Sequence, residues 1–270
     1  MRITRFAAAD EVSYGLVGTA RAGSAAAGGE VIAELAGHPF GGRDGIKLTG
    51  TTYLIDEVRL LAPVIPSKVI GFAPRPPGPA APADYGLDGR SVIYLKPSTA
   101  VCGPSDAIRY PALARRLEAT GELAVVIGRL CHQVPAEQAA AAILGYACAL
   151  DVTAADLGER DGQWARAKGF DTFCPLGPWL ETDAGRASLE LVTSVNGQVR
   201  QRAKIPAPGR DVAALVAAAS NVMTLLPGDV LLAGAAGGAR PGGVALECGD
   251  DVSVSIDGIG TLTNRVEKGD

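Results

Sequence analysis

The sequence has few of the residues on which several common kinds of active site depend. It has only two histidines, His38 and His132, which excludes zinc sites built from several histidines. The five cysteines form no C-x-x-C pair, so neither a zinc ribbon nor a disulfide framework is expected. No P-loop, G-x-G-x-x-G or G-x-S-x-G motif occurs, although the chain has 35 glycines. Metalloprotease, phosphate-loop and nucleophile-elbow chemistries therefore have no support in the sequence.

The charge and hydropathy of the chain limit its partners. The 25 basic and 29 acidic side chains give a net charge of -4, which argues against a broad nucleic-acid-binding face. No uncharged apolar run is long enough to span a bilayer, and the N-terminus has no sustained apolar segment of a signal peptide. With 47% hydrophobic and 20% charged residues, the chain has the balance of a folded protein. We expect a cytoplasmic protein with reduced cysteines and no membrane or nucleic-acid partner.

Short β-rich stretches bounded by glycine dominate the chain. They predict an α+β, mostly β fold, with strands near residues 91–95, 121–128, 146–152, 189–197, 229–234 and 251–267. Two helices are predicted, one opening at Pro135 over 135–143 and one over 210–226 that ends before Pro227. Residues 1–66 indicate a small β-rich N-terminal domain and 67–270 a larger one. The proline-rich segment 73–90 is predicted to be a loop or lid.

Two carboxylates stand out because each borders an apolar stretch. Glu122 lies in GELAVVIG and Asp151 lies in YACALDVTAAD. A buried ionised group is costly unless it is paired or bound to a metal, so both are candidates for a functional site. The alternative is that each occupies a solvated strand end, where a carboxylate needs no partner.

Several longer motifs resemble the fumarylacetoacetate hydrolase family. They occur in the family's order and are KPSTAVCGPSDAI, GELAVVIGR, LGYACALDVTAADL, RDGQWARAKGFDTFCPLGPWL, SVNGQVRQ and LLPGDVLLAG. The N-terminal HPFGG and DEVRLLAPVIPSKVIGF resemble the small leading domain of bacterial members. The resemblance implies the family's mixed β-roll or barrel fold for the C-terminal domain, and commonly a homodimer.

The resemblance also implies a metal site, which this sequence alters. Members of the family typically hold Mg²⁺ or Mn²⁺ with two glutamates one residue apart and a downstream aspartate. The second glutamate matches Glu122 and the aspartate matches Asp151, but Thr120 stands at the position of the first glutamate. Magnesium is often bound by only one or two carboxylates, with water and substrate as the other ligands, so the loss should weaken the site without abolishing it. We therefore expect metal binding that is weak, dependent on substrate, or absent.

Other positions of the family's site have lost polar side chains. The family usually has a histidine and a glutamate that activate water. At that point this chain reads APRPPGPAAP, which contains neither residue, and neither His38 nor His132 aligns there. Ala155 and Gly158 replace an arginine and a glutamine, and Ala235 replaces a threonine that helps to hold the substrate's carboxylate. These changes predict a wider pocket with less preference for a small dianion.

Two lysines match positions where the family has them, Lys96 in YLKPS and Lys168 in AKGFDTF. Each could be an ordinary solvated lysine. If Lys168 faces the pocket instead, its ammonium could neutralise Glu122 and Asp151 in place of a metal. Lys168, Glu122 and Asp151 are therefore the candidate catalytic residues, with Lys96 and Gln201 as lesser pocket contacts.

These features favour a small-molecule enzyme whose hydrolytic chemistry has been replaced. Decarboxylation, tautomerisation or cyclisation of a bulkier keto compound would need mainly positioning and carbonyl polarisation, and a role in secondary-metabolite biosynthesis would fit such a substrate. One alternative is ordinary magnesium-dependent cleavage or decarboxylation of acylpyruvate or oxaloacetate type acids. Another is a non-catalytic homologue that only binds a ligand.

Overall fold

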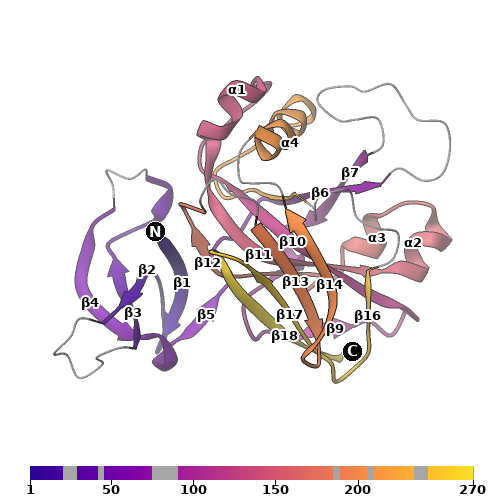
Figure 1. Cartoon of the computed structure of the whole chain (residues 1–270), viewed down its shortest axis with the longest axis horizontal. Helices are drawn as coiled ribbons and strands as arrows, with labels where there is room; N and C mark the ends of the chain where they lie inside the picture. Colours follow the sequence, from indigo (N-terminus) through magenta and orange to yellow (C-terminus); the bar gives the residue numbers. More distant parts are fainter. Residues whose placement is uncertain are drawn as a thin grey trace.

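The computed structural model describes residues 1–20, 29–41, 46–74, 91–184, 189–205, 210–233 and 243–269. The described chain is mostly β, with an open sheet of 13 strands and a second sheet of five. Figure 1 shows the first strands as a separate lobe beside the larger body of the molecule. The expectation of an α+β, mostly β protein with a roll-like larger part is confirmed. Among the described residues, no helix is long and apolar enough to cross a membrane.

The 13-stranded sheet begins in the N-terminal lobe. Its strands there are β1 (Arg2–Ala8), β2 (Glu11–Thr19), β3 (Glu30–Leu35), β4 (Leu48–Leu54) and β5 (Arg59–Leu61). They pair in the order β4-β3-β2-β1, with β5 also on β1. The chain then passes from β5 to β6 (Lys68–Pro74), and we propose this connection as the domain boundary.

The larger part of the chain supplies the remaining strands and the α-helices. The strands are β7 (Ser91–Pro97), β8 (Val101–Cys102), β9 (Ile108–Tyr110), β10 (Leu117–Ile127), β11 (Ile143–Ala154), β12 (Cys174–Glu181), β13 (Leu189–Val195), β14 (Gln198–Ile205), β15 (Val230–Leu232), β16 (Val244–Leu246), β17 (Asp251–Ile256) and β18 (Gly260–Lys268). The helices are α1 (Ala136–Ala139), α2 (Ala155–Asp161), α3 (Ala165–Lys168) and α4 (Arg210–Val222). Short 3₁₀ turns are η1 (Pro39–Gly41), η3 (Ile55–Glu57), η4 (Ser98–Ala100) and η5 (Ala140–Ala142).

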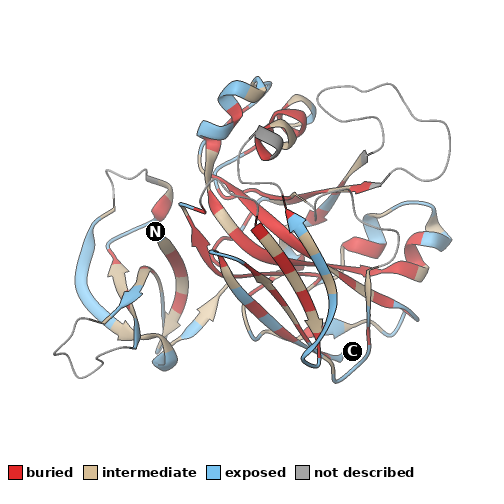
Figure 2. Ribbon diagram, viewed as in Figure 1, coloured by how far each residue is buried: buried red, intermediate tan, exposed pale blue. Residues whose placement is uncertain are grey.

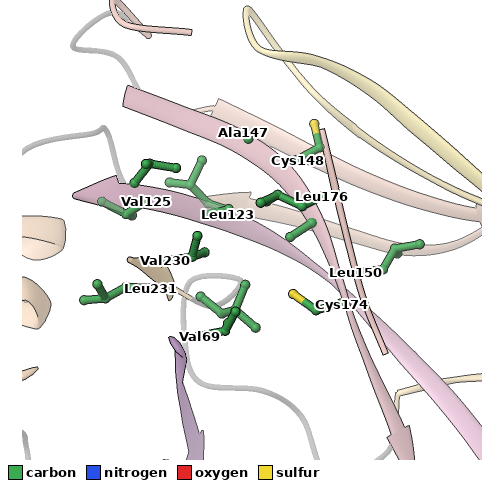
Figure 3. Close-up of a cluster of buried hydrophobic side chains, with 14 of the residues drawn as sticks. Val69, Leu123, Val125, Ala147, Cys148, Leu150, Cys174, Leu176, Val230 and Leu231 are labelled. Carbon is green, nitrogen blue, oxygen red and sulfur yellow. The ribbon is translucent and has the colours of Figure 1, made fainter. Parts of the chain in front are cut away.

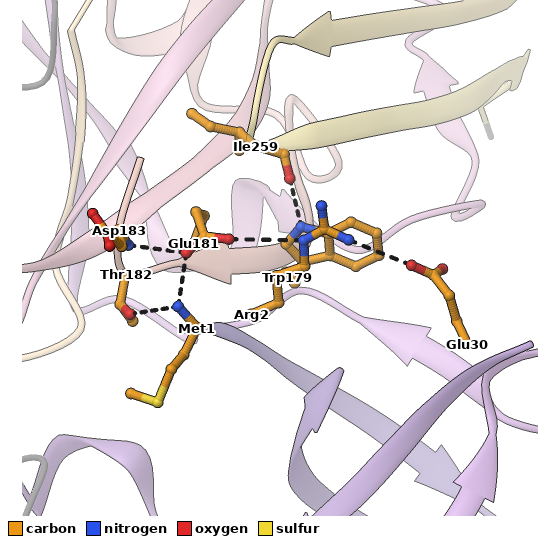
Figure 4. Close-up of polar contacts among 8 residues, drawn as sticks. All are labelled: Met1, Arg2, Glu30, Trp179, Glu181, Thr182, Asp183 and Ile259. Atoms are coloured by element: carbon orange, nitrogen blue, oxygen red, sulfur yellow. Dashed lines mark hydrogen bonds and ion pairs between the residues drawn. The ribbon is translucent and has the colours of Figure 1, made fainter. Parts of the chain in front are cut away.

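The N-terminal lobe joins the larger part through β1 and β12. Arg2 pairs with Glu181 and Ile3 with Leu180, so one sheet runs through both parts. The Met1 amino group lies 2.8 Å from the Glu181 carboxylate, and the Arg2 guanidinium lies 4.9 Å from the Trp179 ring centre (Figure 4). These contacts fix the lobe against β12.

The core forms around β10, β11 and β12, which lie side by side in the middle of the large sheet. Their burial is nearly continuous, as Figure 2 shows, because the sequences of β10 and β11 are apolar on both faces. Figure 3 shows the side chains that fill this region, among them Leu123, Ala147, Leu150, Leu176 and Val230. A charged side chain on these strands therefore lies inside the protein and needs a partner.

The second sheet, in the order β14-β13-β17-β18-β9, packs against one face of β10 and β11. Along β13, buried residues alternate with half-buried ones, as expected for a strand with one face on the core. Gly121 on β10 marks the closest approach. A Cβ atom there would overlap the hydroxyl of Thr193 and lie 2.9 Å from Cγ2 of Val254. The absence of a side chain at residue 121 lets the sheets approach this closely.

The secondary-structure predictions differ from the described structure in several places. The helix predicted over 135–143 is one α-helical turn, α1, followed by η5, and α4 ends at Val222 rather than 226. The helices α2 and α3 were not predicted, because they have only seven and four residues. The strands β12 and β14 were also missed, β12 because Pro175 and Pro178 interrupt its sequence. The predicted loop or lid over 73–90 lies almost entirely outside the described residues.

The substitution Gly121→Ala tests the contact between the sheets. Because the added methyl group must displace Thr193 or Val254, we expect the free energy of unfolding to fall by about 1–3 kcal/mol. Urea unfolding would measure it. Gly18→Ala is the matched control, since a Cβ at Gly18 meets nothing within 4 Å and should leave the stability nearly unchanged. Equal stability of the two variants would contradict this packing.

Candidate active site

The register of β10 and β11 brings the candidate carboxylates to one face of the large sheet. Thr120 pairs with Asp151, and Glu122 pairs with Ala149. Side chains two residues apart on a strand point to the same face, and directly paired residues share a face. Thr120, Glu122 and Asp151 therefore lie together, on the face opposite to the one where Gly121 meets the second sheet. This grouping follows from strand pairing and could not be read from sequence spacing.

Both carboxylates are buried within their strands. Glu122 is 4% exposed and Asp151 is 5% exposed, and neither is at a strand end. The alternative that each occupies a solvated strand end is therefore wrong. Their burial requires nearby groups that compensate the charge.

Lys96 supplies one compensating charge and holds several segments together. Its side chain on β7 is completely buried, and Nζ lies 2.8 Å from Oδ1 of Asp151. The same ammonium donates to the backbone carbonyls of Val152, Phe173 and Lys168, at 2.8, 2.8 and 3.3 Å. With no exposed surface, Lys96 does not contact a ligand in this arrangement, so its predicted role as a pocket contact is replaced by a positioning role.

Lys168 supplies the second charge. It ends α3, is 6% exposed, and Nζ donates to Oδ2 of Asp151. Nζ also lies 4.5 Å from the ring centre of Tyr94 and 5.5 Å from that of Trp164. The interpretation of Lys96 and Lys168 as solvated lysines is wrong for both. Lys168 instead lies in a cage of one carboxylate and two aromatic rings.

Tyr94 completes the surroundings of Asp151. Its hydroxyl donates to Oδ2 of Asp151 at 2.6 Å. The ring crosses over Gly71 on the neighbouring strand β6, where a Cβ atom would overlap it. Burial, followed by the negative charges of Asp151 and Glu122, raises the pKa of Tyr94 well above its usual range. Tyr94 is therefore a permanent hydrogen-bond donor at this site.

The ionisation of Asp151 is set by its two lysines. Burial opposes the charged form, but the ammonium groups of Lys168 and Lys96 outweigh it and lower the pKa of Asp151 to about 2. Burial lowers the pKa of Lys96, while Asp151 acts in the opposite direction. Burial also raises the pKa of Cys174, which lies near the same charges, to about 12. Asp151 is thus a fixed anion, and Cys174 is a neutral thiol rather than a nucleophile.

The donor set does not fit a strongly bound divalent cation. Thr120 offers no carboxylate, and both oxygens of Asp151 already face ammonium or hydroxyl groups. Within the described part of the chain, no three His, Cys, Asp or Glu side chains are grouped as metal ligands. With one carboxylate missing and Asp151 already paired, a cation here would depend mainly on Glu122, water and substrate, so tight binding of Mg²⁺ or Mn²⁺ is not expected.

The remaining predicted pocket positions have different surroundings. Ala155 and Gly158 share a face of α2, and a Cβ atom at Gly158 would lie 3.3 Å from Cβ of Ala167 and 3.4 Å from Cζ3 of Trp164. Ala167 and Trp164 therefore pack against α2 at Gly158, and the expectation that this residue widens the pocket stays a prediction. Ala235 lies outside the described residues.

Gln201 on β14 contacts the backbone of β10 at Gly121, between Thr120 and Glu122. Its Oε1 accepts hydrogen bonds from the Gly121 N–H at 3.0 Å and from the Thr193 hydroxyl at 2.7 Å. Gln201 thus supports β10 from the side of the second sheet. His38 and His132 are both exposed and make no contact with the Asp151 cluster among the described interactions.

A surface pocket of about 660 Å³ lies beside the loop that follows Lys168. Its lining residues are Arg109, Pro111, Ala112, Leu113, Gly169, Phe170, Asp171 and Gly269. None of the predicted site residues lines it, so this pocket is separate from the Asp151 cluster.

Sequence reasoning missed Tyr94 and Trp164. Trp164 stands within a motif that carried the family resemblance, four residues before Lys168, and Tyr94 stands two residues before Lys96, just ahead of another such motif. On a strand the first spacing places two side chains on one face, and on a helix the second does the same. These two spacings are the features of the sequence from which Tyr94 and Trp164 could have been predicted.

Two open sheets, with a buried cluster of lysines and carboxylates on the face of the large sheet away from the second sheet, are consistent with the fumarylacetoacetate hydrolase class. One family model, described as Fumarylacetoacetate (FAA) hydrolase C-terminal, matches residues 79–267, and another, Rv2993c-like, N-terminal, matches residues 1–63. The chain therefore belongs to the fumarylacetoacetate hydrolase family, whose members include isomerases, hydrolases and a tautomerase.

Three relatives illustrate the similarity. Protein Rv2993c of Mycobacterium tuberculosis is 46% identical over 98% of this chain and 98% of its own length. The rat mitochondrial oxaloacetate tautomerase Fahd2a is 34% identical over 78% of this chain and 70% of its own length. The crystal structure of 5-carboxymethyl-2-hydroxymuconate delta-isomerase from Mycobacterium smegmatis is 45% identical, with a TM-score of 0.84 over 99% of this chain and 100% of that chain.

The low pKa of Asp151 predicts a specific pH dependence of stability. Asp151 has a pKa of about 2 in the folded protein against an ordinary value of 3.8, so its contribution is present above pH 3.8 and is lost as the pH falls through 2. This contribution is about 2 kcal/mol. The free energy of unfolding of Asp151→Asn should therefore fall less steeply on acidification than that of the wild type.

Urea unfolding at a series of pH values would measure both slopes. Asp171→Asn is the matched control, since Asp171 is exposed and should leave the wild-type slope unchanged. If Asp151→Asn had the same slope as the wild type, Asp151 would not be held ionised by its lysines.

Proposed function

We propose that the protein catalyses proton transfer beside a carbonyl group, as in the tautomerisation or isomerisation of a small keto compound. One observation carries this proposal: the Lys168 ammonium is fixed on Asp151 in a buried site that also holds the carboxylate of Glu122. A cation stabilises the negative oxygen of an enolate, and a carboxylate can accept the proton that leaves carbon. These are the two groups that enolisation requires.

Each residue of the cluster has a distinct part in the proposed reaction. Glu122 accepts the proton from the carbon next to the substrate carbonyl, and the electrons of the broken C–H bond form the C=C bond of the enolate. Lys168 donates a hydrogen bond to the carbonyl oxygen as its negative charge develops. Asp151 orients Lys168, while Lys96 and Tyr94 hold Asp151 in place. Return of the proton to oxygen or to another carbon completes tautomerisation or isomerisation.

We propose that this reaction depends weakly or not at all on a divalent metal. The two ammonium groups beside Asp151 supply positive charge where the family's metal would act. Hydrolysis would require an activated water, and the segment that matches the family's histidine and glutamate has neither residue. Magnesium-dependent hydrolysis therefore has less support than enolisation.

The relatives support the same chemistry. One neighbour is named as a delta-isomerase and one relative as an oxaloacetate tautomerase, and both names describe proton movement around a carbonyl or conjugated system. Decarboxylation of a keto acid also forms an enolate, by loss of CO₂ instead of a proton, and an enolate carbon can attack a second carbonyl to close a ring. Both reactions therefore belong to the proposal as well, as does a bulkier substrate from secondary metabolism. The five free cysteines support a reducing, cytoplasmic location, and the family resemblance supports a homodimer.

Replacing Lys168 tests the proposal. Loss of a donor at a developing oxyanion lowers kcat by about 10²–10³-fold, so Lys168→Ala should lose this much turnover and retain its fold. Proton NMR of deuterium exchange at the carbon beside the carbonyl, with oxaloacetate and phenylpyruvate as probes, measures the rate. Lys204→Ala is the control because Lys204 is exposed on β14. Wild-type exchange by Lys168→Ala, or no exchange of either probe by the wild type, contradicts the proposal.

Replacing Glu122 tests the identity of the base. Glu122→Gln keeps the shape of the side chain but cannot accept a proton, and the loss of a general base lowers kcat by about 10²–10⁴-fold. We expect KM to change little. The same exchange assay, with circular dichroism to verify the fold, measures the effect. Full activity of Glu122→Gln would assign the proton transfer to another group.

A further inference from the structure

Trp164 lies beside α2, where Ala155 and Gly158 stand at the positions of the family's arginine and glutamine. It immediately precedes α3, and the N–H of Lys168 donates to its carbonyl at 2.9 Å, so the two side chains lie one helical turn apart. The edge of its ring packs on Gly158, with 3.4 Å between Cζ3 and the position of a Cβ atom. The contact is van der Waals packing of the indole against α2.

The indole ring is also close to Lys168, which contacts the substrate's carbonyl oxygen in the proposed reaction. Lys168 Nζ lies 5.5 Å from the centre of the ring. A substrate whose carbonyl oxygen reaches Lys168 can therefore place its neighbouring atoms beside the indole. Trp164 remains half-buried, so part of its surface is not covered by the protein. Aromatic surfaces of this kind bind planar conjugated groups by stacking.

The charge of the cluster limits the kind of substrate that can bind. The ammonium groups of Lys96 and Lys168 balance the carboxylates of Glu122 and Asp151 in formal charge. With Ala155 in place of an arginine, that helix position supplies no further cation. A substrate with two carboxylates would bring excess negative charge into a mostly buried site, which is unfavourable. A neutral compound or a monoanion avoids this cost.

We infer that Trp164 is a specificity-determining residue, which selects a planar, conjugated keto compound with at most one carboxylate over a small dianion. This inference rests on the proposed function for the position of the carbonyl. The substrate's enol or enolate lies against the indole while its oxygen meets Lys168. The ring thus offers a stacking contact beside Lys168, where Ala155 supplies no charged side chain.

Binding of two 2-oxo acids tests this assignment. Phenylpyruvate has one carboxylate and an aromatic ring that is conjugated in its enol, whereas oxaloacetate has two carboxylates and no ring. Isothermal titration should give the wild type an affinity for phenylpyruvate at least about tenfold higher than for oxaloacetate. Trp164→Ala should lose about tenfold in phenylpyruvate affinity and less than about twofold in oxaloacetate affinity, whereas Trp164→Phe should stay within about threefold of the wild type.

The ratio of the two affinities separates this role from a merely structural one. If Trp164 only positioned Lys168, Trp164→Ala would weaken both probes equally, and the inference would be overturned. Wild-type protein that binds oxaloacetate as well as phenylpyruvate, or that does not bind phenylpyruvate, would also overturn it. Urea unfolding of each variant verifies that the fold is retained.

Deuterium exchange on the same samples separates this inference from the proposed function. Selective, Trp164-dependent binding of phenylpyruvate without exchange of either probe would support the specificity role and contradict the proposed catalysis. Exchange of both probes with rates and affinities independent of Trp164 would support the catalysis and contradict the specificity role.

Discussion

The site depends on one buried carboxylate that is shared by two lysines. Asp151 lies on a strand in the middle of the large sheet, where an isolated charge would be strongly unfavourable. Lys96 and Lys168 approach its two oxygens from different segments, and the hydroxyl of Tyr94 adds a third contact. Removal of any one of these groups leaves a buried charge less compensated, so the cluster constrains β7, β11 and α3 relative to one another.

This arrangement explains why the fold can be retained while the family's metal ligands are reduced. In the family, a divalent cation would offset the carboxylates. Here Thr120 removes one carboxylate, and the two ammonium groups balance the formal charges of Glu122 and Asp151. Chemistry that needs a fixed cation near a carbonyl oxygen and a nearby carboxylate base is compatible with this charge distribution. Chemistry that needs a metal-activated water is less compatible, since magnesium would have to compete with Lys168 for Asp151.

The sequence predicted the parts of the fold that depend on local pattern. The apolar runs around Glu122 and Asp151 became the buried strands β10 and β11, and the long alanine-rich segment became α4. It could not predict the direction of Lys168, because α3 has only four residues and a weak local signal. Nor could it predict the burial of Lys96, whose carbonyl partners are 56 to 77 positions away along the chain. Nor could it predict the packing of Trp164 against Gly158, because Gly158 lies on α2 and Trp164 precedes α3.

The most direct test of this account is the dependence of turnover on metal. The metal content of freshly purified protein should be measured first, followed by titration with Mg²⁺ and Mn²⁺ in the presence and absence of oxaloacetate, and by the rate of deuterium exchange in a chelator. The account predicts far less than one metal ion per chain and a rate that the chelator leaves nearly unchanged. Near-stoichiometric metal, together with turnover that the chelator abolishes and Mg²⁺ or Mn²⁺ restores, would contradict it.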